Sequence, residues 1–510
     1  MNRRKFLGQI GATVALSAVT PLKSKTVDKS GVAQRPNILW ICPDQQRYDT
    51  IHCVNNPHIR TPNLDRLCAE GVAFTKAYSQ NQLCTPSRAS FLTGLYPSAV
   101  HQNRNGNATF PANDRVKLIT KRLADIGYDC GLAGKLHISA AFKGAEERVD
   151  DGYRKFWYSH SPGQGIGKGN QYTDWLKTQG VHPKDIFQKH NKRENSYTVY
   201  KPDVDVKYHQ TTWCADRAIE FMNEKHKGPW LMSVNIYDPH PPFDGPAKYT
   251  KHYDPKKVPY PLWRESDVHV QNRLKDYFFQ SKVRKPDEKT LQAKASYWGS
   301  IELIDEQVGR MIQALKDSGQ YENTIVLFHA DHGDMQGDHG LRQKGCRFYE
   351  GLVRNPLIIS WPGHFKRGLQ SHALVELTDI APTLADITGC QLEWTHGKSL
   401  LPILTGKADP DHHRDFVRCE YLDSVNMYAP YEPEKHKPCF ATMYRDARYK
   451  LSVYHGHDYG ELYDLENDPD EFDNLWENPD FQEIKNDLIK KSFDATMVVA
   501  DPGPKQIGRY

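Results

Sequence analysis

The sequence lacks any long hydrophobic run after its first 25 residues. A membrane-spanning helix needs about 18 or more consecutive apolar residues, so we expect no membrane span in the mature protein. Internal repeats are absent as well. A hydrophobic content of 38% with 25% charged residues is typical of a globular protein.

Cysteines are present, but they form neither Cys-x-x-Cys pairs nor zinc-ligand spacings. A zinc module or a dithiol redox motif is therefore not predicted. The pairing of any disulfides is left open, and most of the cysteines are expected to be buried thiols. The ten positions are 42, 53, 68, 84, 130, 214, 346, 390, 419 and 439.

The chain also lacks a bulk charge of either sign. Its formal net charge is +4, and residues 1–25 contain five cations and no acid, so their removal leaves −1 (4 − 5). The bulk charge therefore says nothing about polyanion binding, and any affinity for an anion must come from locally placed cations. We expect no nucleic-acid partner. The five cations are Arg3, Arg4, Lys5, Lys23 and Lys25.

The N-terminus has the pattern of an export signal. A twin arginine precedes a weakly apolar run from Gly8 to Val19, as in bacterial twin-arginine leaders, which export folded proteins. A disordered basic tail is the alternative. We expect residues 1–25 to be a signal peptide and the protein to be exported to the periplasm or secreted.

Strands that alternate with helices predict a doubly wound α/β fold, with a large, mostly parallel sheet sandwiched by helices. A chain of 510 residues is too long for one ordinary core. We therefore expect a catalytic domain over 35–405 and a smaller C-terminal α+β domain over 406–510, with an antiparallel sheet and a terminal helix. Two stretches without periodicity, 142–208 and 244–284, are expected to be binding or lid segments.

Polar residues follow four of the predicted strands. Open α/β sheets bind ligands at the carboxyl ends of their strands, so these residues predict a site there, although each group alone could be a polar turn. Whether Asp334, Asp338 and His339 also line this site is left open. The four groups are Asp44 with Gln45, Lys135 with His137, His240, and Asp331 with His332.

The segment Cys84-Thr85-Pro86-Ser87-Arg88-Ala89-Ser90-Phe91-Leu92-Thr93-Gly94 carries the strongest signal. Chemistry alone indicates a reactive cysteine at the start of a helix near Pro86, with Arg88 supplying positive charge. At that level, a small buried hydrophobe is the favoured interpretation of such a cysteine.

The full segment resembles the signature of the type I, formylglycine-dependent sulfatases of the alkaline phosphatase superfamily. The resemblance extends from Pro36 to about Pro362 and resumes at 461–469. It implies that a maturation enzyme oxidises Cys84 to formylglycine (3-oxoalanine), whose hydrate is the nucleophile. This maturation enzyme is therefore an expected partner.

The same resemblance implies a metal site formed by Asp44, Gln45, Asp331 and His332, together with the modified Cys84. The family usually holds Ca²⁺ there, with Asp-Asp and Asp-Asn at the two ligand pairs. Oxygen ligands suit Ca²⁺, but the imidazole of His332 does not. Mg²⁺ or Mn²⁺ therefore stays open.

The remaining roles are also implied by the resemblance. Arg88 would orient the hydrate, and Lys135 and Lys344 would bind the sulfate. His240 would bind the sulfate and protonate the leaving alcohol, and His137 would remove a proton from the second hydroxyl so that sulfate is released.

These expectations describe an exported sulfatase that hydrolyses the sulfate esters of a sulfated polysaccharide or oligosaccharide. Aromatic residues in the irregular stretches favour a carbohydrate substrate, because sugar rings pack on aromatic faces. The alternatives are an arylsulfatase or choline-type sulfatase, a phosphonate monoester or phosphodiester hydrolase, and a non-catalytic binder of sulfated glycans.

Overall fold

The computed structural model describes residues 35–54, 56–106, 110, 116–141, 145–161, 169–183, 205–274, 281–423 and 439–500. The chain divides into two compact units, Met1–Arg35 and Pro36–Tyr510, and everything below concerns the second. The predicted signal peptide, residues 1–25, lies outside the described residues. Among the helices that are described, none is long and apolar enough to cross a membrane.

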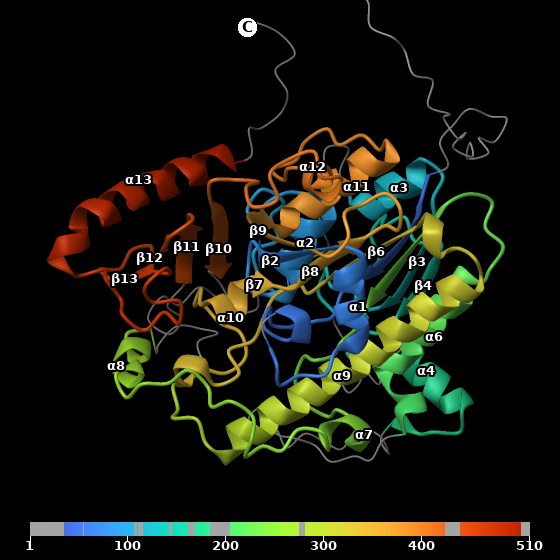
Figure 1. Cartoon of the computed structure of the whole chain (residues 1–510), viewed down its shortest axis with the longest axis horizontal. Coiled ribbons are helices and arrows are strands. Elements are labelled where there is room, and N and C mark those ends of the chain that lie inside the picture. Colours follow the sequence, from blue (N-terminus) through green and yellow to red (C-terminus); the bar gives the residue numbers. More distant parts are fainter. Residues whose placement is uncertain are drawn as a thin grey trace, which may run out of the picture. The chain divides into compact units, whose positions relative to one another are not determined.

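A nine-stranded sheet forms the centre of the described structure, in the order β4-β3-β5-β1-β6-β8-β2-β7, with β9 paired to β2 (Figure 1). Pairing is parallel from β4 to β6 and between β2 and β9, whereas β8 is antiparallel to β6 and β2, and β7 to β2. The mostly parallel sheet is as predicted. Its strands are β1 (Asn37–Ile41), β2 (Val72–Tyr78), β3 (Asp129–Gly134), β4 (Lys155–Tyr158), β5 (Trp230–Asn235), β6 (Thr324–His329), β7 (Arg354–Asn355), β8 (Leu357–Ser360) and β9 (Leu369–Glu376).

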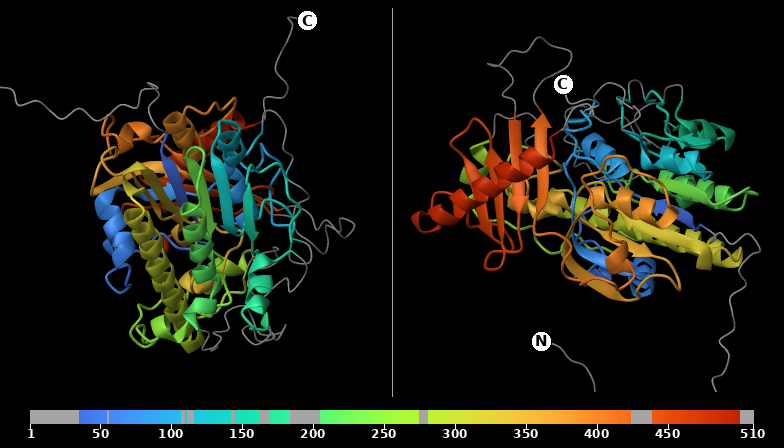
Figure 2. Two further views of the ribbon diagram at one scale, coloured as in Figure 1. Left: turned by 90° about the vertical axis from the view of Figure 1, so that its right-hand side faces the viewer. Right: turned by 90° about the horizontal axis from the view of Figure 1, so that it is seen from above.

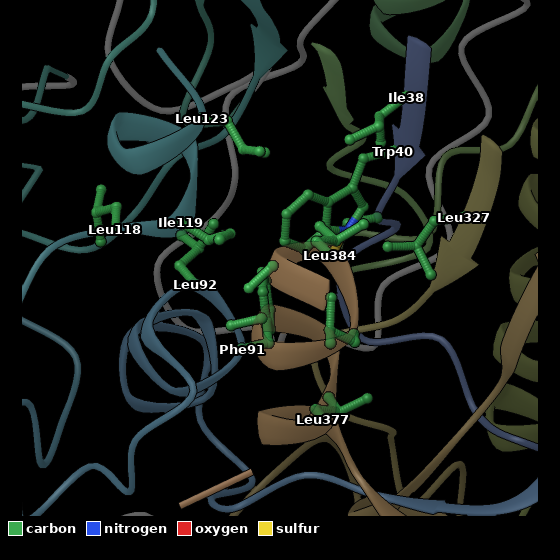
Figure 3. Close-up of a cluster of buried hydrophobic side chains, with 14 of the residues drawn as sticks. Ile38, Trp40, Phe91, Leu92, Leu118, Ile119, Leu123, Leu327, Leu377 and Leu384 are labelled. Atoms are coloured by element: carbon green, nitrogen blue, oxygen red, sulfur yellow. The ribbon is translucent and has the colours of Figure 1, made fainter. Parts of the chain in front are cut away.

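Helices cover both faces of this sheet, as Figure 2 shows. Residues of β1 alternate between two hydrophobic cores, because Ile38 and Trp40 pack on one face and Leu39 and Ile41 on the other. The first core also receives Phe91 from α2 and is drawn in Figure 3. Apolar residues on both faces explain why β1 reads as a continuous apolar run.

The helices of the described residues are α1 (Pro62–Glu70), α2 (Cys84–Thr93), α3 (Ile119–Asp125), α4 (Gln171–Thr178), α6 (Gln210–Met222), α7 (Ala247–Thr250), α8 (Asp267–Asn272), α9 (Glu288–Asp317), α10 (Glu350–Val353), α11 (Ile380–Thr388), α12 (Leu401–Leu404) and α13 (Gln482–Val498). Side chains of α2, α3 and α11 enter the first core. Those of α1, α6 and α9 enter the second.

Two expectations need correction. The stretch 142–208 is not wholly irregular, because β4 extends the sheet beside β3 and α4 follows it. Sequence analysis also missed β2 and β9, which pair with each other in parallel. β4 is an edge strand of four residues, and the apolar run of β2 is interrupted by Lys76. Both carry too little periodicity to be recognised without their partner strands.

A second sheet in the described residues has four antiparallel strands in the order β10-β11-β12-β13. They are β10 (Val417–Asp423), β11 (Cys439–Arg445), β12 (Tyr449–Tyr454) and β13 (Gly460–Asp464). Leu488 and Ala495 of α13 pack on this sheet. The antiparallel sheet and the terminal helix are as predicted, while a domain boundary near residue 405 stays a prediction.

A buried ion pair joins the second sheet to the segment after β6. Arg347 donates to Glu461 of β13 at 2.7 Å, and both side chains are at most 2% exposed. Tyr454 and Tyr459 donate to the same carboxylate at 3.1 and 2.8 Å. Arg347 also donates to the carbonyl oxygen of Val270 at 3.1 Å.

We predict that Glu461→Ala lowers the free energy of unfolding by about 3–5 kcal/mol, because it leaves the Arg347 guanidinium buried without its counter-ion. The control is Asp494→Ala, which breaks the exposed Lys490–Asp494 pair and should cost less than about 1 kcal/mol. Urea unfolding of both variants measures the difference. Equal losses would contradict the prediction.

Candidate active site

Cys84 is the first residue of α2 and is 1% exposed. The helix therefore begins two residues before the predicted start at Pro86, and all ten of its residues are buried. It ends at Gly94, whose φ of +77° is left-handed, and a Cβ there would lie 2.5 Å from Thr395 Oγ1. Only glycine combines that backbone conformation with so close a neighbour.

The four predicted groups of polar residues follow neighbouring strands. The sheet order β3-β5-β1-β6 sets the ends that carry Lys135, His240, Asp44 and Asp331 side by side. Asp44 is tied to the β5 end by a bond from its backbone N–H to the carbonyl oxygen of Ile236 at 3.0 Å. The structure thus brings together residues that lie far apart in the chain.

The Asp44 carboxylate is held by two cations. Lys135 Nζ donates to Asp44 Oδ2, and Arg88 Nη2 lies 3.4 Å from the same atom. Arg88 Nε donates to Asp331 Oδ2 at 2.9 Å. Burial opposes ionisation of Asp44, but Lys135 above all outweighs it, and the pKa of Asp44 is held well below its usual value.

Arg88 therefore contacts the two carboxylates rather than the thiol. Its third bond goes from Nη1 to the carbonyl oxygen of Lys135 at 3.0 Å. Asp44, Asp331 and Arg88 are fully buried. Arg88 thus fixes the relative position of the two carboxylates.

The predicted metal ligands form one cluster. Asp44, Cys84, Asp331 and His332 each place a ligand atom within 4.8 Å of the others. His332 Nδ1 donates to the carbonyl oxygen of Gly333 at 2.9 Å, which leaves the Nε2 lone pair toward the cluster. Burial lowers the pKa of His332, but the charge of Asp331 outweighs it and the pKa is raised.

The fifth predicted ligand, Gln45, is oriented by its neighbours. Its Nε2 donates to the carboxylate of Asp334, and its Oε1 accepts from Lys344 Nζ at 2.9 Å. Its φ of +67° lies in the left-handed region, where non-glycine residues are uncommon and often functional. Two carboxylates, an amide oxygen and an imidazole nitrogen together fit a divalent cation.

Lys344 lies next to Cys84, the predicted nucleophile. Its Nζ is 2.9 Å from Cys84 Sγ and 3.4 Å from His332 Nε2. Burial and Asp44 oppose ionisation of the Cys84 thiol, yet Lys135 and Lys344 outweigh them and hold its pKa well below the ordinary value. Negative charge on side chain 84 is thus stabilised by two fixed cations.

His240 is anchored by its own segment. Its Nδ1 donates to the carbonyl oxygen of Pro241 at 2.7 Å, which leaves Nε2 as the nitrogen available to a substrate. Its ring packs on Tyr237 at 4.7 Å between centroids. Burial, followed by the charge of Lys344, lowers the pKa of His240 to about 3.

His137 is also buried, with an exposed fraction of 6%. Its Nδ1 has no hydrogen-bond partner among the described residues, and its ring meets His160 edge-on at 4.4 Å between centroids. Burial, with Lys135 next, holds the pKa of His137 well below its usual value. The imidazole is therefore neutral and able to accept a proton.

Glu146 is a residue that sequence analysis missed. Its carboxylate accepts the backbone N–H groups of His137, Ile138 and Ser139 at 2.7, 3.1 and 3.3 Å. These bonds hold His137 at a φ of +55°. Glu146 lies in the stretch without periodicity, so no local signal pointed to it.

Comparison with known proteins agrees with this geometry. Residues 36–390 match the family model described as Sulfatase, and residues 337–497 match the model described as N-sulphoglucosamine sulphohydrolase, C-terminal. The chain belongs to the sulfatase family. This sulfatase is accordingly a hydrolase of sulfuric esters.

Three similar proteins with different names match most of this sulfatase. It is 30% identical to an arylsulfatase of Clostridium perfringens over 90% of this chain and 93% of that protein. It is 24% identical to an N-acetylglucosamine-6-O-sulfatase of Bacteroides thetaiotaomicron over 96% of this chain and 90% of that protein. The solved structure of the phosphonate monoester hydrolase of Agrobacterium radiobacter is similar with a TM-score of 0.78 at 27% identity, covering 91% of this chain and 96% of that one.

Glu146 generates a prediction about pH. Burial raises the pKa of Glu146 from 4.5 to about 7, so the unfolded chain ionises this carboxyl before the folded protein does. Wild-type stability relative to Glu146→Gln should therefore be greatest below pH 4.5 and fall by roughly 3 kcal/mol as the pH rises to about 7.

Chemical denaturation of both proteins at a series of pH values between 4 and 8 measures this difference. Glu483→Gln, at an exposed position of α13, is the control and should follow the wild type at each pH. A difference between wild type and Glu146→Gln that does not change with pH would contradict the prediction.

Proposed function

We propose that this protein is an exported sulfatase that hydrolyses sulfate esters of a carbohydrate, with formylglycine made from Cys84. The observation that carries the proposal is the set of cations and imidazoles around position 84. Lys344 Nζ contacts Cys84 Sγ at 2.9 Å, and Lys135 pairs with Asp44, which itself lies 3.6 Å from Cys84 Sγ.

A divalent cation and a formylglycine at position 84 would fit this site. A divalent cation held by Asp44, Gln45, Asp331 and His332 would place a fixed positive charge beside the ester oxygens. The aldehyde at position 84, once hydrated, supplies one hydroxyl as nucleophile and a second that allows sulfate to leave. Cys84 Sγ stands at the position of the first hydroxyl oxygen.

Lys135 and Lys344 bind the sulfate group. Both ammonium groups are held before substrate arrives, Lys135 by Asp44 and Lys344 by Gln45. Fixed charges need no rearrangement when negative charge develops in the transition state, which makes them effective catalysts. Arg88 acts one step away, because it positions Asp44 and Asp331.

His137 and His240 move the protons. His137 accepts a proton from the second hydroxyl. Its ring is neutral, and its Nδ1 has no hydrogen-bond partner among the described residues. His240 presents Nε2 and protonates the leaving alcohol. Burial, followed by Lys344, lowers the pKa of His240, and the negative charge of a bound sulfate ester would offset the effect of the lysine and favour the protonated ring.

Two facts support a carbohydrate substrate and export. A relative that covers nearly the whole chain is named for a carbohydrate, N-acetylglucosamine. The leader pattern over residues 1–25, with its twin arginine, is typical of exported bacterial proteins, and extracellular sulfate esters include those of polysaccharides.

A second candidate is hydrolysis of phosphonate monoesters, favoured by the similarity to the Agrobacterium radiobacter enzyme. A phosphonate monoester carries one negative charge, as a sulfate ester does, so the two lysines suit either substrate. Assays with both classes decide between them.

The proposal predicts that the protein, produced together with a maturation enzyme, releases sulfate from members of a panel of sulfated glycans and sugars. Ion chromatography measures the sulfate, and mass spectrometry of the Cys84 peptide measures its conversion to the aldehyde. Cys84→Ala should lower the rate by at least about 10³-fold, because the nucleophile is lost.

Phenyl phosphonate monoesters belong in the same panel. Turnover of these alone, without release of sulfate from any sugar, would replace the proposal by the second candidate. Full activity of protein that carries an unmodified thiol would refute the role of formylglycine.

A further prediction concerns His240. His240→Ala should lower the turnover of a sugar sulfate about 10²-fold more than that of 4-nitrophenyl sulfate, because a sugar alkoxide needs the proton in the transition state and a nitrophenolate does not. Steady-state kinetics on both substrates measures the two losses. Equal losses would mean that His240 only binds the sulfate.

A further inference from the structure

A cavity of about 260 Å³ lies between the segment that follows β1 and the first turns of α9. We call it the Trp298 pocket. Exposed His58 lies at its edge, while buried Trp298 and Gln336 line its interior. Arg47, Asn56 and Lys294 also line the pocket.

Gln336 supplies the first sign of a ligand. Its side chain is 1% exposed, and neither Oε1 nor Nε2 has a hydrogen-bond partner among the described residues. Its backbone is held by a bond from its N–H to Asp334 Oδ1 at 2.8 Å and has a φ of +48°. A buried amide is normally satisfied, so this one needs a group in the pocket that both donates and accepts.

The opposite wall is aromatic and cationic. The rings of Trp298 and His58 are parallel within 9°, with centroids 6.5 Å apart. Lys294 Nζ lies 5.7 Å from the Trp298 centroid and donates to the carbonyl oxygen of Pro259 at 3.0 Å. An ammonium has three donors, so the bond to Pro259 leaves capacity to donate to a ligand, and burial lowers the pKa of Lys294.

Charges of both signs lie around the pocket. Arg47 pairs with Asp49 and with Asp338, each at 2.8 Å. Lys294 donates to the carbonyl oxygen of Pro259, and the charges of Asp338 and Asp49 act on it as well. The two cations and the two carboxylates balance, so the pocket suits a neutral ligand.

Hydrogen bonds connect this pocket to the candidate metal ligands. Arg47 N–H donates to Tyr297 OH at 2.9 Å, and Tyr297 OH donates to the carbonyl oxygen of Gln45 at 2.7 Å. Arg47 Nη1 donates to the carbonyl oxygen of Asp334 at 2.8 Å, and the Asp334 carboxylate holds the Gln45 side chain. The pocket thus shares its wall with the predicted catalytic centre.

We propose that the Trp298 pocket binds one sugar ring of the substrate, a ring other than the one whose sulfate is removed. A pyranose offers hydroxyl groups that donate and accept, for Gln336, and an apolar face for Trp298. The volume is below the roughly 300–1,000 Å³ of sites for drug-sized ligands, so it accommodates a single ring. This inference rests on the proposed carbohydrate substrate.

The test compares substrates with and without a second ring. We would measure kcat/KM of the matured protein for disaccharides derived from heparin and chondroitin sulfate, for glucosamine 6-sulfate and for 4-nitrophenyl sulfate. Gln336→Leu and Lys294→Met should each lower the ratio of the disaccharide value to the 4-nitrophenyl sulfate value about tenfold, because each removes hydrogen bonds to the second ring.

The matched control is Gln313→Leu, the same exchange at an exposed position of α9, which should leave that ratio unchanged. Melting temperatures show whether each variant is folded. If both pocket variants turn over disaccharides with the wild-type ratio, the proposal is overturned.

Failure of the proposed function is a separate outcome. If the wild type releases sulfate from no sugar, saturation-transfer NMR with N-acetylglucosamine, galactose and glucuronic acid tests the pocket directly. Transfer to one of these sugars that Gln336→Leu abolishes supports a sugar site. No transfer to any of them from the wild type means that water alone satisfies Gln336, which overturns the proposal.

Discussion

The structure of the candidate active site depends on keeping the carboxylate of Asp44 ionised although it is fully buried. Lys135 and Arg88 hold this carboxylate from two sides, and Cys84 and His332 lie against its other oxygen. A buried charge is tolerated only when it is paired and hydrogen-bonded. The strand ends around Asp44 must therefore meet within hydrogen-bond distance, and the order of the sheet provides this.

The ion pairs of Arg88 with Asp44 and Asp331 also affect the contacts of Lys344. Because Arg88 already neutralises part of the charge on Asp44 and Asp331, Lys344 can point at Cys84 and Gln45 instead. Lys344 comes from the segment between β6 and the Arg347–Glu461 pair. The second sheet thus anchors a segment that carries Lys344, so the stability of this sheet and the position of that lysine beside Cys84 are linked.

Much of the fold and of the candidate site was predictable from local sequence. Continuous apolar runs such as β1 and β5 marked buried strands, and the polar residues directly after them marked the site. Local reasoning did not find the partners of Arg88, because Asp44 and Asp331 follow other strands. It also did not point to Glu146 and Gln336, because the backbone groups and the cavity beside them are brought there only by folding.

The burial of α2 bears on when Cys84 could be modified. Cys84 is 1% exposed, and every residue of the helix that follows is covered by the rest of the fold. The proposed maturation enzyme would need the backbone and side chain of Cys84 in an open conformation, so the proposed oxidation would have to precede folding. A twin-arginine leader exports proteins that have already folded. Oxidation, folding and transport would then follow in that sequence, and a chain that folded too early would leave the cell with a thiol that nothing outside could reach.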